Sequence, residues 1–172
     1  MEHGGLSSVP ANYTQKYFTW TTINSDCGLI YRTNVPGGTN SITVGYGNYQ
    51  GYISGIFVEM SPVTTIDLSQ DFHPSGSVTL PSTITGTTTS QTSQANEMAF
   101  YVLSCAQSNV NGSYTFTPSS GWTTLFQETD DTTYATGICG YQSLTSIQNV
   151  SVSITRGPSS SDYPNLGIFT FK

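Results

Sequence analysis

The stretch Asn149-Val150-Ser151-Val152-Ser153-Ile154-Thr155 carries the clearest structural signal in the chain. Valine and isoleucine alternate with serine and threonine in strict period two, which is the pattern of a β-strand with one buried face. β-Branched residues also pack well on a pleated sheet. We therefore expect a strand with its apolar face in a core and its hydroxyl face toward water.

Similar short runs of β-branched and aromatic residues recur along the chain, with turn sequences such as Asn111-Gly112 and Ser119-Ser120-Gly121 between them. No window shows the apolar spacing of a helix. About ten short strands at this spacing predict an all-β fold, a two-sheet antiparallel β-sandwich. The expected strands cover residues 13–23, 28–33, 41–46, 52–60, 98–105, 113–117, 123–127, 133–141, 149–155 and 166–171.

The 172 residues are within the size of one domain and can bury a core without disulfide or metal support, so we expect a single β-sandwich domain over 1–172. The stretch 69–96 differs from the rest because it is rich in Thr and Ser and poor in large apolar residues. It could pair only as an edge strand or run as a surface connection. We place a crossover at 61–97.

The two ends of the chain resemble each other in three matches that keep their order. The number of residues between the two members of a match increases from one match to the next along the chain. Insertions in surface turns explain this increase, because a longer loop costs little free energy. We therefore expect pseudo-repeat halves at about 13–60 and 98–172, with Trp20 and Trp122 as core anchors. The matches are Trp20-Thr21-Thr22-Ile23 with Trp122-Thr123-Thr124-Leu125, Ile42-x-Val44-x-Tyr46 with Val150-x-Val152-x-Ile154, and Gly55-Ile56-Phe57 with Gly167-Ile168-Phe169.

The chain has very few charged residues. Lys and Arg total four and Asp and Glu ten, which gives a net charge of −6 and a charged fraction of 8%, against about 25% in ordinary soluble domains. A surface of hydroxyls and amides suits a protein that contacts others or lies outside a cell. Nucleic-acid binding is not expected, because few cations are available to release counterions.

Cysteine usage and hydropathy add two expectations. Cys27, Cys105 and Cys139 form no CxxC pair and are expected to be small buried hydrophobes, although their disulfide state stays open. No stretch approaches the roughly 18 apolar residues of a transmembrane helix, and residues 1–9 lack a signal-peptide pattern. We expect a soluble chain without membrane insertion.

Catalytic patterns are scarce. Only His3 and His73 could serve in a nucleophilic triad, and there is no GxSxG elbow. Among the carboxylates, Glu59 stands in an apolar run where burial would raise its pKa, although a half-exposed acid at a strand end is the commoner explanation. We therefore predict no enzymatic activity and no cofactor. The carboxylates that could form a catalytic pair are Glu59, Asp67, Asp71, Glu97, Glu128, Asp130 and Asp131.

One group of acids could bind a metal. Glu128, Asp130 and Asp131 could contribute oxygen ligands to Ca²⁺, although they lack the spacing of a known calcium loop. A solvated turn is the alternative and the stronger interpretation. No Cys or His spacing suits zinc.

The glycine-rich segment 45–52 is expected to be a hairpin tip. Tyr46, Asn48, Tyr49 and Tyr52 on it resemble the content of antibody-like binding loops, in which rigid rings give contact area at small entropic cost. These four residues are the predicted binding surface. A well-packed tight turn is the alternative.

The run Phe116-Thr117-Pro118-Ser119-Ser120-Gly121-Trp122-Thr123-Thr124-Leu125 resembles the "tP-x-GWt-x-l" strand and turn of phage and bacterial surface β-sandwich domains with a jelly-roll-like fold. In those domains an alternating strand and a closing strand follow, as 151–155 and 167–171 could here. The segments 55–60 and 65–67 are similar to a further part of that pattern. The resemblance implies a structural or attachment role, as in phage tail fibres and head decorations.

These observations predict a non-enzymatic structural subunit of a virion, such as a phage head decoration or fibre domain, or of another extracellular assembly. Its expected partners are further copies of itself and other structural proteins, at a virion or extracellular surface. The alternative is a glycan-binding or adhesion module on a phage tail or a secreted protein, in which aromatic rings stack on sugar faces.

Overall fold

A computed structural model describes residues 6–20, 25–33, 35, 41–43, 45–46, 56, 58–60, 65–79, 82–107, 114–129, 135–157 and 161–172. The elements within these ranges are β-strands, and every strand pair is antiparallel. Nowhere in these ranges is there a helix with the length and apolar character needed to cross a membrane. The strands are β1 (Leu6–Ser8), β2 (Thr14–Trp20), β3 (Ser25–Tyr31), β4 (Gly45–Tyr46), β5 (Ile66–Phe72), β6 (Val78–Thr79), β7 (Ser82–Thr87), β8 (Glu97–Gln107), β9 (Thr115–Pro118), β10 (Thr123–Glu128), β11 (Ala135–Leu144), β12 (Ser151–Gly157) and β13 (Ser161–Phe171).

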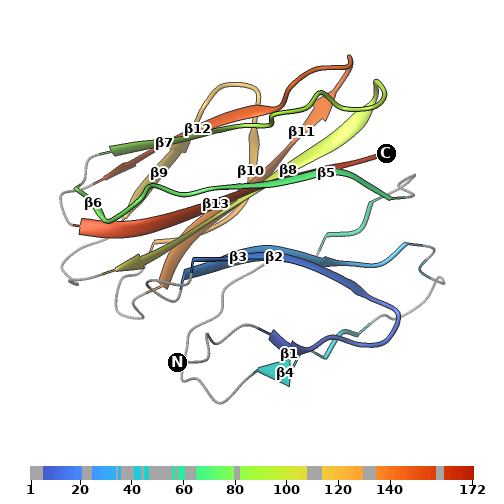
Figure 1. Cartoon of the computed structure of the whole chain (residues 1–172), viewed down its shortest axis with the longest axis horizontal. Helices are drawn as coiled ribbons and strands as arrows, with labels where there is room; N and C mark the ends of the chain where they lie inside the picture. Colours follow the sequence, from blue (N-terminus) through green and yellow to red (C-terminus); the bar gives the residue numbers. More distant parts are fainter. Residues whose placement is uncertain are drawn as a thin grey trace.

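Two sheets form the sandwich (Figure 1). The larger has the order β10-β11-β8-β13-β5, with β6 also pairing with β13, and the smaller has the order β7-β12-β9. The pairing is nested along the chain, since β5 pairs with β13, β7 with β12, and β8 with β11. A long hairpin whose two arms are rolled up together gives this order, which is jelly-roll topology. The predicted all-β, two-sheet antiparallel β-sandwich is confirmed.

The turn between β9 and β10 takes the chain from the smaller sheet to the larger one. Gly121 in this turn has a φ of 91°, a conformation that glycine adopts without the steric cost of a Cβ. Trp122 follows at once and packs against the core, with its ring 5.1 Å from the Tyr101 ring in an edge-to-face arrangement. The predicted anchoring role of Trp122 is therefore confirmed.

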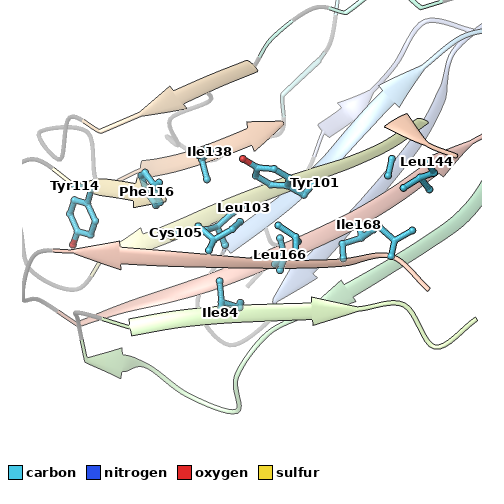
Figure 2. Close-up of a cluster of buried hydrophobic side chains, with 14 residues drawn as sticks. Ile84, Tyr101, Leu103, Cys105, Tyr114, Phe116, Ile138, Leu144, Leu166 and Ile168 are labelled. Atoms are coloured by element: carbon cyan, nitrogen blue, oxygen red, sulfur yellow. The ribbon is translucent and has the colours of Figure 1, made fainter. Parts of the chain in front are cut away.

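The core lies between the two sheets (Figure 2). On β12, Val152 and Ile154 are fully buried while Ser151 and Thr155 are exposed, as the period-two alternation predicts. Burying each such side chain contributes roughly 1.5–3 kcal/mol. The buried cluster comprises Ile84, Ala99, Tyr101, Leu103, Cys105, Tyr114, Phe116, Ile138, Leu144, Val150, Val152, Ile154, Leu166 and Ile168.

The hairpin β2–β3 covers the opposite face of the larger sheet and makes a third layer (Figure 1). Phe18 of β2 stacks on Phe169 of β13, with ring centroids 5.4 Å apart. Tyr31 of β3 meets Phe171 edge to face at 5.6 Å. Because β13 is covered on both faces, its residues from Pro164 to Phe171 are all buried.

The Thr- and Ser-rich stretch 69–96, placed within the expected crossover, contains β-strands. Its described residues form β5 and β7 at one edge of each sheet, with the short β6 between them. Edge pairing therefore holds for residues 69–72 and 82–87, whereas residues 73–77 and 88–96 lie in no strand and connect the strands around them.

The internal repeat finds uneven support in the described residues. The later member of each match lies in or beside β10, β12 and β13, whereas residues 41–43, 56 and 58–60 belong to no strand. The strands expected at those positions were wrong, because strand propensity is realised only where a neighbouring strand pairs. Trp20 ends β2, with its side chain outside the described part.

Candidate functional site

The smaller sheet presents an outer face made of hydroxyl side chains. We define this hydroxyl face as Thr83, Thr85 and Thr87 of β7, Ser151, Ser153 and Thr155 of β12, and Thr115 and Thr117 of β9. It arises because the residues between them, such as Ile84, Val152 and Ile154, point into the core. The hydroxyl face therefore carries no charge.

Hydroxyl pairs bridge β7 and β12 in register. The side-chain oxygens are 3.0 Å apart for Thr83 and Thr155, 2.8 Å for Thr85 and Ser153, and 2.8 Å for Thr87 and Ser151. A hydroxyl is both a donor and an acceptor, so each pair keeps capacity for a further bond outward. The result is a regular and uncharged array.

The outer edge of β7 has free backbone groups. Thr88 N donates to Val150 O at 2.9 Å, and antiparallel pairs alternate between bonded and non-bonded positions. The N–H and C=O groups of Thr83, Thr85 and Thr87 must therefore point away from β12. No described residue bonds to them, because β7 is the terminal strand of its sheet.

A groove of about 570 Å³ lies beside this edge. The Phe72 ring sits over Gly86 at its side, where a Cβ added to Gly86 would lie 2.5 Å from a ring carbon. The groove thus combines apolar walls with a polar rim beside a strand edge. Its lining residues are Asp71, Phe72, His73, Pro74, Val78, Thr83, Ile84, Thr85, Arg156 and Pro164.

A second polar cluster ties the end of β13 to β5. Lys172 Nζ lies 2.6 Å from Asp67 Oδ1 and 2.8 Å from Ser93 Oγ. Asp67 also accepts bonds from the Ser93 backbone N–H at 2.6 Å and from its hydroxyl at 2.7 Å. Burial alone would raise the pKa of Asp67, but the Lys172 ammonium and the Ser93 donors outweigh it and lower the pKa from 3.8 to about 2.

Glu97 is the buried neighbour of this cluster, with 2% of its surface exposed. Its Oε1 accepts a bond from Gln94 N at 3.3 Å. Burial raises the pKa of Glu97; the Thr170 hydroxyl lowers it and the negative charge of Asp67 raises it further. The sequence included both Asp67 and Glu97 among the possible carboxylate pairs, and the structure brings these two together.

An ion pair is buried at the other end of the sandwich. Arg156 Nη1 donates to both carboxylate oxygens of Asp162, at 2.7 and 2.6 Å, and neither side chain is exposed. Arg156 Nη2 donates to Ser82 Oγ at 2.5 Å. Burial raises the pKa of Asp162, although the adjacent guanidinium opposes the rise. This pair links β12, β13 and β7.

The predicted binding residues fall mostly outside the described part of the chain. The Tyr46 backbone pairs with Leu6 in the β1–β4 ladder, whereas Asn48, Tyr49 and Tyr52 are not among the described residues. The glycan-binding alternative that depends on them stays a prediction.

Other predicted site residues are dispersed. Glu128 is half-buried at the end of β10, while Asp130 and Asp131 lie outside the described ranges. Within those ranges, no three His, Cys, Asp or Glu side chains come together in a group that could hold a metal ion. Glu59 is exposed and lies in no strand, so its expected place inside an apolar strand was wrong.

The remaining predictions concern His73 and the cysteines. His73 Nε2 lies 3.7 Å from Asp71 Oδ2 on the groove rim. All three cysteines are free thiols; Cys27 and Cys105 are buried and Cys139 is half-buried. The prediction of small buried hydrophobes is therefore confirmed for Cys27 and Cys105.

Comparisons with protein families, with curated proteins and with solved structures find no match to this chain.

Replacing Glu97 with Gln should stabilise the protein at neutral pH. The pKa of Glu97 is raised in the folded state, so the wild type loses stability as pH rises above the unfolded value near 4.5. Gln stays neutral and can still donate to Asp67. Urea unfolding should show the gain at about pH 7 and none at about pH 4; Glu59→Gln, at an exposed position, should change neither. A variant weaker than wild type at both pH values would contradict this assignment.

Replacing Asp162 with Asn should strongly destabilise the fold. The change leaves the Arg156 guanidinium buried without its counter-charge, which typically costs about 3–5 kcal/mol. Urea unfolding at neutral pH measures the loss. Asp71→Asn, on the exposed groove rim, is the matched control and should cost less than about 1 kcal/mol. Equal effects of the two variants would show that the buried pair is not important for stability.

Proposed function

We propose that this protein is a non-enzymatic structural subunit of a virion or another extracellular assembly and acts by packing its surface against neighbouring subunits. The observation that carries the proposal is the hydroxyl face, an ordered and uncharged array on a chain of net charge −6. Like charges repel neighbouring copies elsewhere on the surface. Electrostatic repulsion between neighbouring copies is therefore weakest at the uncharged hydroxyl face.

The chemistry of the smaller sheet suits contact between protein surfaces. Thr and Ser are short, so little side-chain entropy is lost when a neighbour covers them. Their hydroxyls can find partners on any surface that offers donors and acceptors, which limits the cost of removing water. The free β7 edge adds backbone groups of the same neutral kind.

Two ion pairs of the described residues also support a structural role. Asp67 and Lys172 bond to each other and to Ser93, and Arg156 bonds to Asp162 in the interior. These bonds connect neighbouring strands to one another. We assign these ion pairs to stability.

The resemblance of residues 116–125 to phage and bacterial surface domains suggests the setting of a head decoration or fibre domain. In the structure these residues form β9, the turn at Gly121 and the start of β10. Such a module would bind further copies of itself and other structural proteins at the surface of a particle.

The proposal predicts a discrete oligomer in solution. Light scattering over a range of concentrations should give a mass that is a defined multiple of 18.5 kDa. Thr85→Lys, which places a charge on the hydroxyl face, should shift that mass toward the monomer, because the ammonium must lose its water on contact. Gln127→Lys, exposed on β10, should leave the mass unchanged. A monomer at every concentration, with no binding to a particle, would contradict the proposal.

A further inference from the structure

The free edge of β7 is unusual in lacking protection. Natural edge strands carry charges, prolines or bulges that prevent pairing with another chain. The segment Ser82–Thr87 has none of these, and its pairing with β12 is continuous over six residues. The outward N–H and C=O groups of Thr83, Thr85 and Thr87 form a short, regular ladder that is ready for a partner strand.

From this edge we infer that β7 pairs antiparallel with β7 of a second copy, so that the two smaller sheets join into one continuous sheet. The inference rests on the proposed function, because it names the surface through which copies of the subunit meet. A two-fold axis relates the copies, and the same patch serves on both, as in most closed homodimers.

The sequence of β7 fits itself when the axis passes beside Thr85. Thr85 then faces Thr85 of the second copy, and Thr83 faces Thr87 in both directions. The outward groups of all three residues find partners, because these are the positions whose N–H and C=O face the free edge. The Thr side chains meet in the same kind of cross-strand pair that they already make with β12.

The inward side chains also complement each other in this register. Ile84 of one copy lies opposite Gly86 of the other, so a large side chain faces a residue that has no side chain of its own. The Phe72 ring already lies over Gly86, and the incoming Ile84 would pack beside that ring in the groove. The apolar groove walls at Phe72, Val78 and Pro164 would then be partly covered.

Charge allows two copies to approach at this edge. The joined strands carry no ionisable side chain, so the repulsion between two copies of net charge −6 is weakest here. The hydroxyl faces of the two copies become one surface across six strands. Assembly by this edge therefore enlarges the neutral surface that the proposed function uses.

Disulfide trapping of single cysteine variants tests this pairing. In a Cys139→Ser background, which removes the half-buried thiol, Thr85→Cys should give a covalent dimer on mild oxidation. Directly opposed residues have Cα atoms about 5.5 Å apart, within the range of a disulfide. Thr83→Cys is the matched control: its two copies would be roughly 13 Å apart, so it should not link, whereas the double variant Thr83→Cys/Thr87→Cys should.

Two results would overturn the inference, and they can be told apart. If the wild type is oligomeric but Thr85→Cys links no faster than Thr83→Cys, copies meet elsewhere; the β7 pairing fails while the proposed function stands. If the wild type is a monomer at all concentrations and binds no particle, both fail. Thr85→Val keeps the backbone groups and should retain the wild-type mass, which separates loss of pairing from loss of the hydroxyl.

Discussion

The structure depends on the burial of β13 on both of its faces. One face contributes Leu166 and Ile168 to the sandwich core, and the other contributes Phe169 and Phe171 to the contact with the β2–β3 hairpin. Its two edges are also occupied, by β8 on one side and by β5 and β6 on the other. No other described strand joins so many parts of the molecule, so its removal would expose the core and release the third layer together.

The few charged groups add specificity to this apolar framework. Arg156 and Asp162 join β12 to β13, and Lys172 with Asp67 joins the end of β13 to β5. Both pairs therefore fix the same central strand at its two ends. With two of the four cations used in this way, much of the remaining surface is left to hydroxyl and amide groups. The same scarcity of charged residues leaves the outer face of the smaller sheet, made of Thr and Ser, without charge.

The sequence predicted the strand in which apolar residues alternate most clearly, at 149–155, and also the shorter strand at 123–127. It expected Trp122 as a core anchor because the internal repeat matched it to Trp20, and Trp122 does pack against the core. It could not place β5 and β7, since their few apolar residues, such as Leu68 and Ile84, stand among Ser and Thr, and their pairing partners lie far along the chain. The sequence could not predict the ion pair of Asp67 and Lys172 either, because these two residues are 105 positions apart. Only part of the hydroxyl face could be predicted: Ser151, Ser153 and Thr155 indicated a polar side of β12. Nothing in the local sequence showed that the hydroxyls of β7 would pair with them.

Amide hydrogen exchange across the chain tests the central role of β13 most directly. A strand buried on both faces and paired on both edges can exchange only when the whole sandwich opens, so its amides should report the global free energy of unfolding. We predict that the amides from Leu166 to Phe171 exchange more slowly than those of any other described strand, while the amides of the β2–β3 hairpin exchange faster. Exchange in β13 as fast as in the edge strand β5 would contradict it, and would show that the two sheets and the hairpin are held together by some other element.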